Sequence, residues 1–178
     1  MEEPEIATEH LQEEIHHHAQ GASQRWIMGV ALTSALLAVL AAISALLSGH
    51  HANEAMIEQM KASDAWSYYQ AKGIKAAVLA SKIDFRRALK QPVAAAEQVK
   101  LEEYGEEQAK ISEEAKELEV SSRRHLRTHE IFARAVTLFQ VAIGIAAIAA
   151  LTRKRRFWLV SMVFGACGLF FFVKGFLK

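Results

Sequence analysis

The sequence has one cysteine, two prolines and nine glycines, and three long stretches of it carry no charge. A single thiol, Cys167, cannot form a disulfide within the chain, so cysteine says nothing about the redox compartment. The scarcity of proline and glycine favours long helices. Because the sequence contains no glycine-rich phosphate loop and no nucleophile elbow, we expect a protein that is not an enzyme.

Three uncharged windows, 26–49, 135–152 and 157–173, are each long enough to cross a bilayer. A helix needs about 20 predominantly apolar residues to span the hydrocarbon core, with a range of about 17 to 25. A buried helix of a soluble protein is the alternative for any one window, but a soluble core of this size would rarely contain three. We therefore expect an all-α membrane protein with transmembrane helices at 26–49, 131–152 and 157–175.

The flanking charges predict how such a protein is oriented. The tail 1–25 is acidic, which is unlike a signal peptide, and its apolar positions suit a short amphipathic helix. Short loops rich in Lys and Arg stay in the cytoplasm, so the basic segment 152–156 and the amino terminus are expected there and 50–130 on the far side. Three basic residues favour the opposite orientation, but long loops follow this rule poorly. They are Arg123, Arg124 and Arg127.

The charged segment 50–130 must leave the membrane and return to the same surface. Proline commonly occupies the first turn of a helix, so Pro92 divides the segment into helices at about 52–90 and 92–130. Two helices of equal length that start and finish at one surface predict a long antiparallel hairpin, a coiled-coil-like stalk between the first and second spans. Nothing near Gly49 requires a break, so each stalk helix is expected to continue into its span.

Two stripes of period seven mark the inner face of the second stalk helix. One consists of Tyr104, Ile111, Leu118, His125 and Phe132, and the other of Leu101, Gln108, Ala115, Ser122 and His129. The first stalk helix offers a looser face, made of Met56, Met60, Ile74, Ala77, Ser81 and Phe85. Neither face is apolar enough for a tight isolated hairpin, which suggests a partner or another copy of the chain.

A family resemblance rests on residues 53–55 (Asn-Glu-Ala) and on 61–72, which read Lys-Ala-Ser-Asp-Ala-Trp-Ser-Tyr-Tyr-Gln-Ala-Lys. This string resembles the central signature of a bacterial family described only as domain of unknown function 4337. The order of features is similar too: an acidic start, one span, a charged helical segment and two closing spans. The resemblance implies a bacterial inner membrane, with 50–130 in the periplasm. It implies no activity, cofactor or catalytic residue.

Four of the eight histidines are predicted to lie at one membrane surface, namely His50, His51, His125 and His129. Imidazoles at positions i and i+4 are good ligands for zinc or copper, and an opposing pair completes a site. Glu54 and Glu130 are close enough in sequence to support such ligands. Haem binding and simple polar packing at the headgroups are the alternatives. Three further histidines, at 16–18, would point in three directions around a helix and therefore make a weaker site.

Two other groups of residues suggest contacts. Trp66, Tyr68 and Tyr69 form either a surface for a partner or an anchor for helix packing. Small residues spaced four apart allow helices to approach closely in a membrane, and a mid-span amide needs a hydrogen-bond partner. The predicted membrane-packing residues are Ala38, Ala42, Gln140 and Gly144.

These features predict a non-enzymatic multi-pass membrane scaffold that forms homo-oligomers in the lipid bilayer and presents a helical stalk. The alternative is an accessory or regulatory subunit of a larger membrane complex that binds a metal or haem through the four histidines. A net charge of +1 gives no reason to expect nucleic acid. No cofactor is expected unless the histidines bind a metal.

Overall fold

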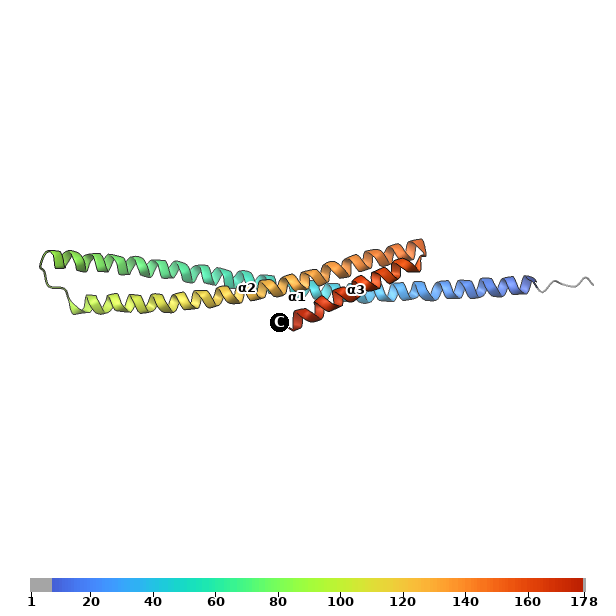
Figure 1. The fold of residues 1–178 in the computed structure, drawn as a ribbon, viewed down its shortest axis with the longest axis horizontal. Helices are drawn as coiled ribbons and strands as arrows, with labels where there is room; N and C mark the ends of the chain where they lie inside the picture. The colour runs from blue at the N-terminus through green and yellow to red at the C-terminus, as the bar shows by residue number, and fades with distance from the viewer. Residues whose placement is uncertain (1–7, 178) are drawn as a thin grey trace, which may run out of the picture. The chain divides into compact units, whose positions relative to one another are not determined.

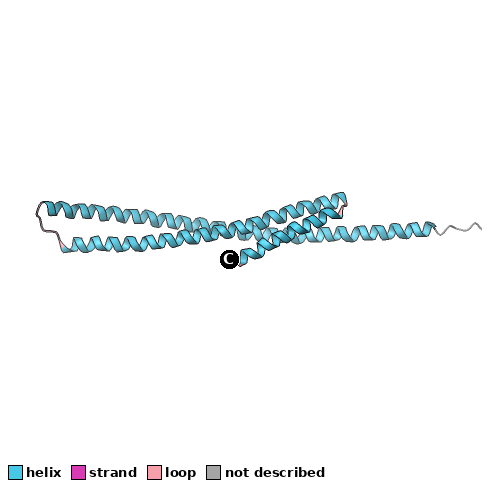
Figure 2. Ribbon diagram, viewed as in Figure 1, coloured by secondary structure: helices cyan, strands magenta, loops and turns pink. Residues whose placement is uncertain are grey.

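The computed structural model describes the backbone of residues 8–177 and the side chains from residue 25 to residue 177. These residues form three helices and no strand: α1 (Thr8–Ala88), α2 (Ala95–Thr152) and α3 (Arg155–Phe176) (Figures 1 and 2). Each helix contains a stretch long and apolar enough to cross a membrane. The prediction of an all-helical chain with three such stretches is confirmed.

The helices end where the chain reverses direction. At the end of α1 the Gln91 amide donates to the Arg86 carbonyl and the Lys90 amide to the Arg87 carbonyl, each over 2.9 Å. This bond pattern is a Schellman motif, and Lys90 occupies its left-handed position with φ of 55°. The reversal uses residues 89–91, so α2 begins at Ala95 and not at Pro92 as predicted. The expected continuity through Gly49 is observed, because α1 has no break there.

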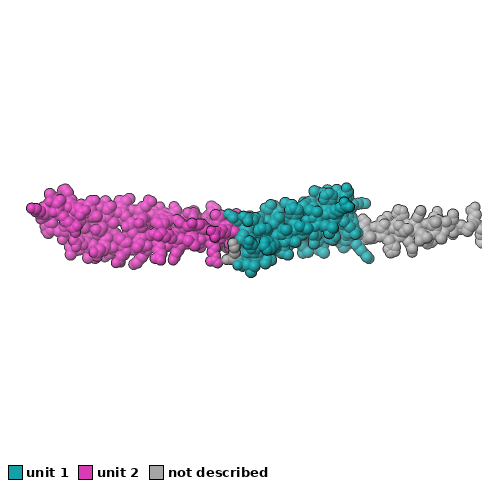
Figure 3. Space-filling model, in the orientation of Figure 1, with its two compact units in different colours: residues 1–48, 130–178 teal, residues 49–129 magenta. Residues whose placement is uncertain are grey.

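The chain divides into two compact units, each described separately below (Figure 3). Unit 1 comprises Met1–Ser48 and Glu130–Lys178, and unit 2 comprises Gly49–His129. Unit 1 therefore contains all of α3 and one part each of α1 and α2. Unit 2 contains the remainder of α1 and α2 with the connection between them.

Unit 1 has a core of phenylalanine rings and alanines. The central cluster consists of Leu37, Ala41, Ala135, Phe139 and Ala142. Phe132 and Phe139 are almost completely buried, and Phe172 of α3 meets both rings edge-on with centroid distances of 6.2 and 6.5 Å. Edge-on aromatic pairs are favourable beyond the area they bury. These rings therefore fix α3 against α2.

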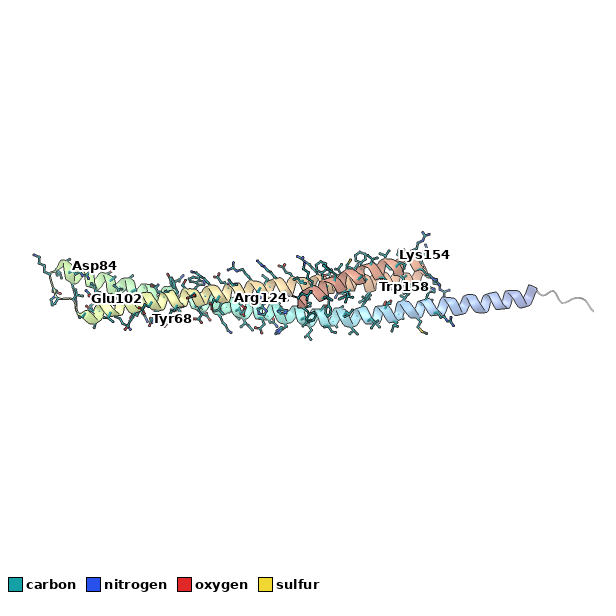
Figure 4. The ribbon with its side chains drawn as sticks, turned by 60° about the horizontal axis from the view of Figure 1, so that its bottom comes forward. Tyr68, Asp84, Glu102, Arg124, Lys154 and Trp158 are labelled. Atoms are coloured by element: carbon teal, nitrogen blue, oxygen red, sulfur yellow. The ribbon has the colours of Figure 1, made fainter. Side chains whose placement is uncertain are left out.

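Glycines on α3 make room for those rings. A methyl group at Gly168 would lie 2.8 Å from ring carbons of Phe139, and one at Gly175 would lie 2.5 Å from Phe132. Both distances are too short for a carbon–carbon contact. Two hydrogen bonds add to the packing: Ser161 Oγ donates to the Ala142 carbonyl (2.7 Å) and Trp158 Nε1 to Thr33 Oγ1 (3.2 Å). Trp158 is labelled in Figure 4.

Unit 2 is an antiparallel pair of helices joined mainly by polar contacts. As residue numbers rise along α1, the partners on α2 fall, from Ala55 with Ser122 to Lys82 with Glu97. The interior is narrow because small residues line it. Buried positions facing inward are Ala55, Ala62 and Ile83 on α1, and Ile111, Ala115 and Ser122 on α2. Small side chains let the two backbones approach closely enough for side chains to reach the opposite carbonyls.

The period-seven stripes of the second helix are confirmed as its inner face, because none of their ten residues is exposed. The face predicted for the first helix is wrong. Its six residues are all exposed, and they include Met56, Met60, Ile74 and Phe85. This half of α1 packs instead through alanines and Ile83, and the methionines of the predicted face remain outside.

Candidate functional site

The imidazoles of His51 on α1 and His125 on α2 meet inside unit 2. Their Nδ1 atoms are 2.9 Å apart, and their ring centroids are 5.2 Å apart. His50 lies beside them, with its ring centroid 5.4 Å from that of His51. Of the four histidines predicted to cluster, His51 and His125 thus come into direct contact across the two helices. His129 is half-buried on the same helix as His125.

Glu58 completes this group, although the sequence did not point to it. Its Oε1 atom lies 4.0 Å from Nε2 of His125 and accepts a hydrogen bond from Ser121 Oγ over 2.8 Å. Its Oε2 atom is buried and accepts no hydrogen bond from the described residues. Glu58 follows His51 by seven positions, so both lie on one helix face, and this spacing is the signal that would have found it.

Burial lowers the pKa of His51 below its ordinary value of 6.5, and the nearby His125 and His50 lower it further. Glu54 acts in the opposite direction, and His129 again lowers it. The lowered pKa favours the uncharged form of His51, which is the form that accepts a hydrogen bond or binds a metal. Among the residues whose side chains are described, no group of three or more His, Cys, Asp or Glu has a spacing that would hold a metal ion.

The aromatic cluster divides into a packed part and an exposed part. Trp66 and Tyr69 are half-buried and edge-on, with centroids 5.5 Å apart, and Trp66 Nε1 donates to Glu119 Oε1 over 2.8 Å. Tyr68 is 52% exposed and carries Lys72 above its ring at 5.2 Å (Figure 4). Trp66 and Tyr69 therefore anchor the helix pair, and Tyr68 alone of the three presents a ring to the outside.

Ion pairs and a groove lie between the aromatic cluster and the connection to α2. Lys72 Nζ is 2.5 Å from Glu107 Oε2, a bond that raises the pKa of Lys72 and lowers that of Glu107. Glu97 pairs with both Lys82 and Arg86, and the Lys82 bond is the main cause of its lowered pKa. The groove has a volume of about 580 Å³ and is lined by Ile74, Lys75, Val78, Leu79, Lys82, Ala96, Glu97, Lys100 and Tyr104.

The predicted membrane-packing residues do not line the packed faces within one chain. Ala38, Ala42, Gln140 and Gly144 are all exposed on unit 1. The buried small residues stand two or three positions further along, at Ala41, Ser44, Ala142 and Ala146. Alanines four apart occur on several faces of these helices, so spacing alone does not identify the packed face. These residues could also lie where two copies of the chain meet, and that contact stays a prediction.

One end of unit 1 carries tryptophans and arginines. The guanidinium of Arg155 lies 5.8 Å from the centroid of Trp26, and a methyl group at Gly29 would lie 3.7 Å from the ring of Trp158. The start of the first uncharged window and the basic connection between α2 and α3 therefore occupy the same end of unit 1. Lys154, in that connection, is exposed, and Figure 4 labels it.

The fold and its contacts define an all-helical protein with three helices long and apolar enough to span a membrane. The chain belongs to the family described as domain of unknown function (DUF4337), whose model matches residues 26–178. The resemblance seen in residues 53–72 is thereby confirmed. No curated protein and no solved structure matches the chain.

Proposed function

We propose that this protein is a non-enzymatic membrane scaffold, in which unit 1 crosses the bilayer and self-associates while unit 2 presents a helical surface outside it. The observation that carries the proposal is the exposure of Gln140 on α2. This residue lies near the middle of a window, 135–152, without any charge. An amide that faces hydrocarbon without a hydrogen-bond partner costs several kcal/mol, so a bilayer-embedded Gln140 requires a partner from another chain.

A second copy of the chain supplies a suitable partner. An amide side chain both donates and accepts hydrogen bonds, so two Gln140 side chains related by twofold symmetry satisfy each other. Gly144 lies one turn further along the same exposed face, and nothing lies within 4 Å of the position a methyl group would occupy there. A glycine at that position lets two helices approach closely. Thr137, one turn before Gln140, is also exposed.

The apolar surface of the two units fits this division. The exposed large residues of unit 1, such as Leu32, Val39 and Phe170, are what lipid requires. On unit 2 the exposed residues Met56 and Met60 form an apolar strip on a segment rich in charge. Clustered apolar side chains in water mark a surface for a protein partner. We assign that surface to the scaffold's partner, either a further copy or a component of a larger membrane complex.

The orientation belongs to the same proposal. The contact between Arg155 and Trp26 supports a shared side for the amino terminus and the loop 152–156. Short basic loops are typical of the cytoplasmic surface and tryptophans of either membrane surface, so the loop leaves 50–130 in the periplasm of a bacterial inner membrane. This orientation is tested by labelling intact cells with an impermeant maleimide, in a Cys167→Ser background. A cysteine at Lys116 should react and one at Lys154 should not.

The oligomer is tested by native mass spectrometry of the full chain released from lipid nanodiscs. We expect a multimer for the wild type and a monomer for Gln140→Leu, which removes the amide while keeping an apolar surface. Gly144→Leu should also give monomers, because its side chain separates the helices. Val163→Leu, on an exposed position of α3, is the matched control and should keep the wild-type mass. A monomeric wild type, or an unchanged mass for Gln140→Leu, would refute the proposal.

A further inference from the structure

The separation of the two imidazole nitrogens in unit 2 suits a metal ion. Two ligands at about 2.0 Å from a metal are about 2.8 Å apart when they subtend a right angle and about 3.3 Å apart in a tetrahedron. The Nδ1 atoms of His51 and His125 are 2.9 Å apart. They come from different helices, α1 and α2, so an ion bound between them would link the two.

The surroundings of His125 fit the way metal-binding histidines are held. A histidine that binds a metal through one nitrogen usually donates the other N–H to a carboxylate, which fixes the ring and its tautomer. If Nδ1 of His125 binds the metal, its proton sits on Nε2, and this atom faces Glu58 Oε1 at 4.0 Å, beyond hydrogen-bond distance, so the hydrogen bond forms only when the two side chains move closer. Ser121 holds that carboxylate by a hydrogen bond of 2.8 Å. The other oxygen, Oε2, is buried without a hydrogen bond from the described residues.

We propose that His51 and His125 bind a divalent transition-metal ion through their Nδ1 atoms, with Glu58 orienting His125. Imidazole ligands suit Cu²⁺, Ni²⁺ and Zn²⁺, of which Cu²⁺ binds most tightly to a given site. The lowered pKa of His51 helps the ion to compete with protons. No third ligand of the kinds His, Cys, Asp or Glu is in place among the described side chains, so the remaining positions are open to water. The site goes beyond the scaffold proposal and does not depend on it.

Copper provides the direct probe. The full chain, purified without a histidine tag and with residues 16–18 changed from His to Asn, is titrated with Cu²⁺ and studied by electron paramagnetic resonance. We expect one equivalent of bound copper whose nitrogen hyperfine pattern reports two imidazoles. This readout needs no substitution within unit 2. A spectrum with no nitrogen pattern, or with nitrogen from one ring only, would overturn the proposal.

Substitutions then assign the ligands by calorimetry with Cu²⁺ and Zn²⁺. His51→Asn and His125→Asn should each weaken binding at least about tenfold, because each removes one ligand. Glu58→Gln should weaken it by about 10- to 100-fold, as expected when the carboxylate behind a ligating histidine is lost. His50→Asn is the matched control and should bind as the parent does. Equal loss in His50→Asn and His125→Asn, or unchanged binding in His125→Asn with helicity retained, would contradict the assignment.

A shared proton is the competing account of the short contact between the rings. One imidazole donating from Nδ1 to the other gives the same 2.9 Å separation without a metal. The two accounts differ in their response to Zn²⁺. A bound ion adds RT ln(1 + [L]/Kd) to the stability of the folded state, so the unfolding temperature of the parent should rise with Zn²⁺ and that of His125→Asn should not. An unfolding temperature of the parent that does not change with Zn²⁺ would refute the metal site.

Discussion

Units 1 and 2 are both built from helices, yet their interiors hold side chains of different size. Unit 1 keeps rings such as Phe132 and Phe139 inside and gives them room with glycines on α3. Unit 2 keeps alanines, a serine and two isoleucines inside and leaves Met56 and Met60 outside. Helix formation alone therefore does not decide how helices pack. In unit 1 large rings fit against glycines, whereas in unit 2 small side chains let the helices pack closely, and hydrogen bonds and ion pairs add to that packing.

The largest effect should come from filling the space that α3 leaves for a ring. Gly168→Ala places a methyl group 2.8 Å from Phe139, and overpacking of this kind typically costs about 1–3 kcal/mol. Gly105→Ala is the matched control, because that helical position also has no neighbour within 4 Å and lies outside the proposed contact between copies. We expect thermal unfolding in lipid nanodiscs, followed by Trp158 emission, to shift downward only for Gly168→Ala. Equal curves for the two variants would show that α3 is not packed through its glycines.

A similar substitution tests the narrow interior of unit 2. Ala62 is completely buried between the helices, whereas Met60 two positions earlier is 59% exposed. Ala62→Leu should therefore destabilise unit 2 by about 1–3 kcal/mol, and Met60→Leu should change its stability by less than about 0.5 kcal/mol. Trp66 emission in a Trp26→Phe, Trp158→Phe background reports this unit. If both leucine variants unfold alike, alanine packing does not hold the pair together.

These contacts show what sequence patterns predict and what they miss. The stripe from Tyr104 to Phe132 identified the inner face of α2 correctly, because its residues recur every seven positions and differ from the charged residues around them. On α1 the largest apolar side chains suggested a face that is in fact exposed, since close approach of the backbones favours alanine. Spacing of small residues failed at Ala38 and Ala42 for a related reason, because alanines occupy several faces of that helix.

The histidine site was predicted only in part. That His51 and His125 lie at the same end of an antiparallel pair could be inferred, but their direct contact could not, because they lie 41 and 33 positions from Pro92. Glu58 was missed although its spacing from His51 places both on one helix face, since a glutamate on a charged helix is usually solvated. Its buried oxygen and its bond from Ser121 depend on how the two helices are rotated, which the sequence pattern of α1 did not fix.

The smallest effect concerns the ion pairs of unit 2 and their response to acid. The pKa of Glu97 is lowered from its ordinary value of 4.5, mainly by the hydrogen bond from Lys82. Its carboxylate therefore stabilises the folded state above that value, and the contribution is lost as pH falls through the lower pKa. Exposed ion pairs contribute little, so we expect a small drop in unfolding temperature between about pH 6 and about pH 3. The unfolding temperature of Glu97→Gln should depend less steeply on pH than that of the wild type. The same pH dependence in both proteins would argue against the ion pair between Glu97 and Lys82.

The account depends most on the proposal that lipid surrounds unit 1 whereas water surrounds unit 2. Val39 and Met60 make a matched pair, because their side chains are 57% and 59% exposed. A spin label is attached to a cysteine at each position in a Cys167→Ser background. For each label, the rate of collisions with oxygen, which is enriched in lipid, is compared with the rate of collisions with a water-soluble nickel complex. We predict that oxygen dominates at Val39 and nickel at Met60. Equal preference for nickel at both positions would contradict the account.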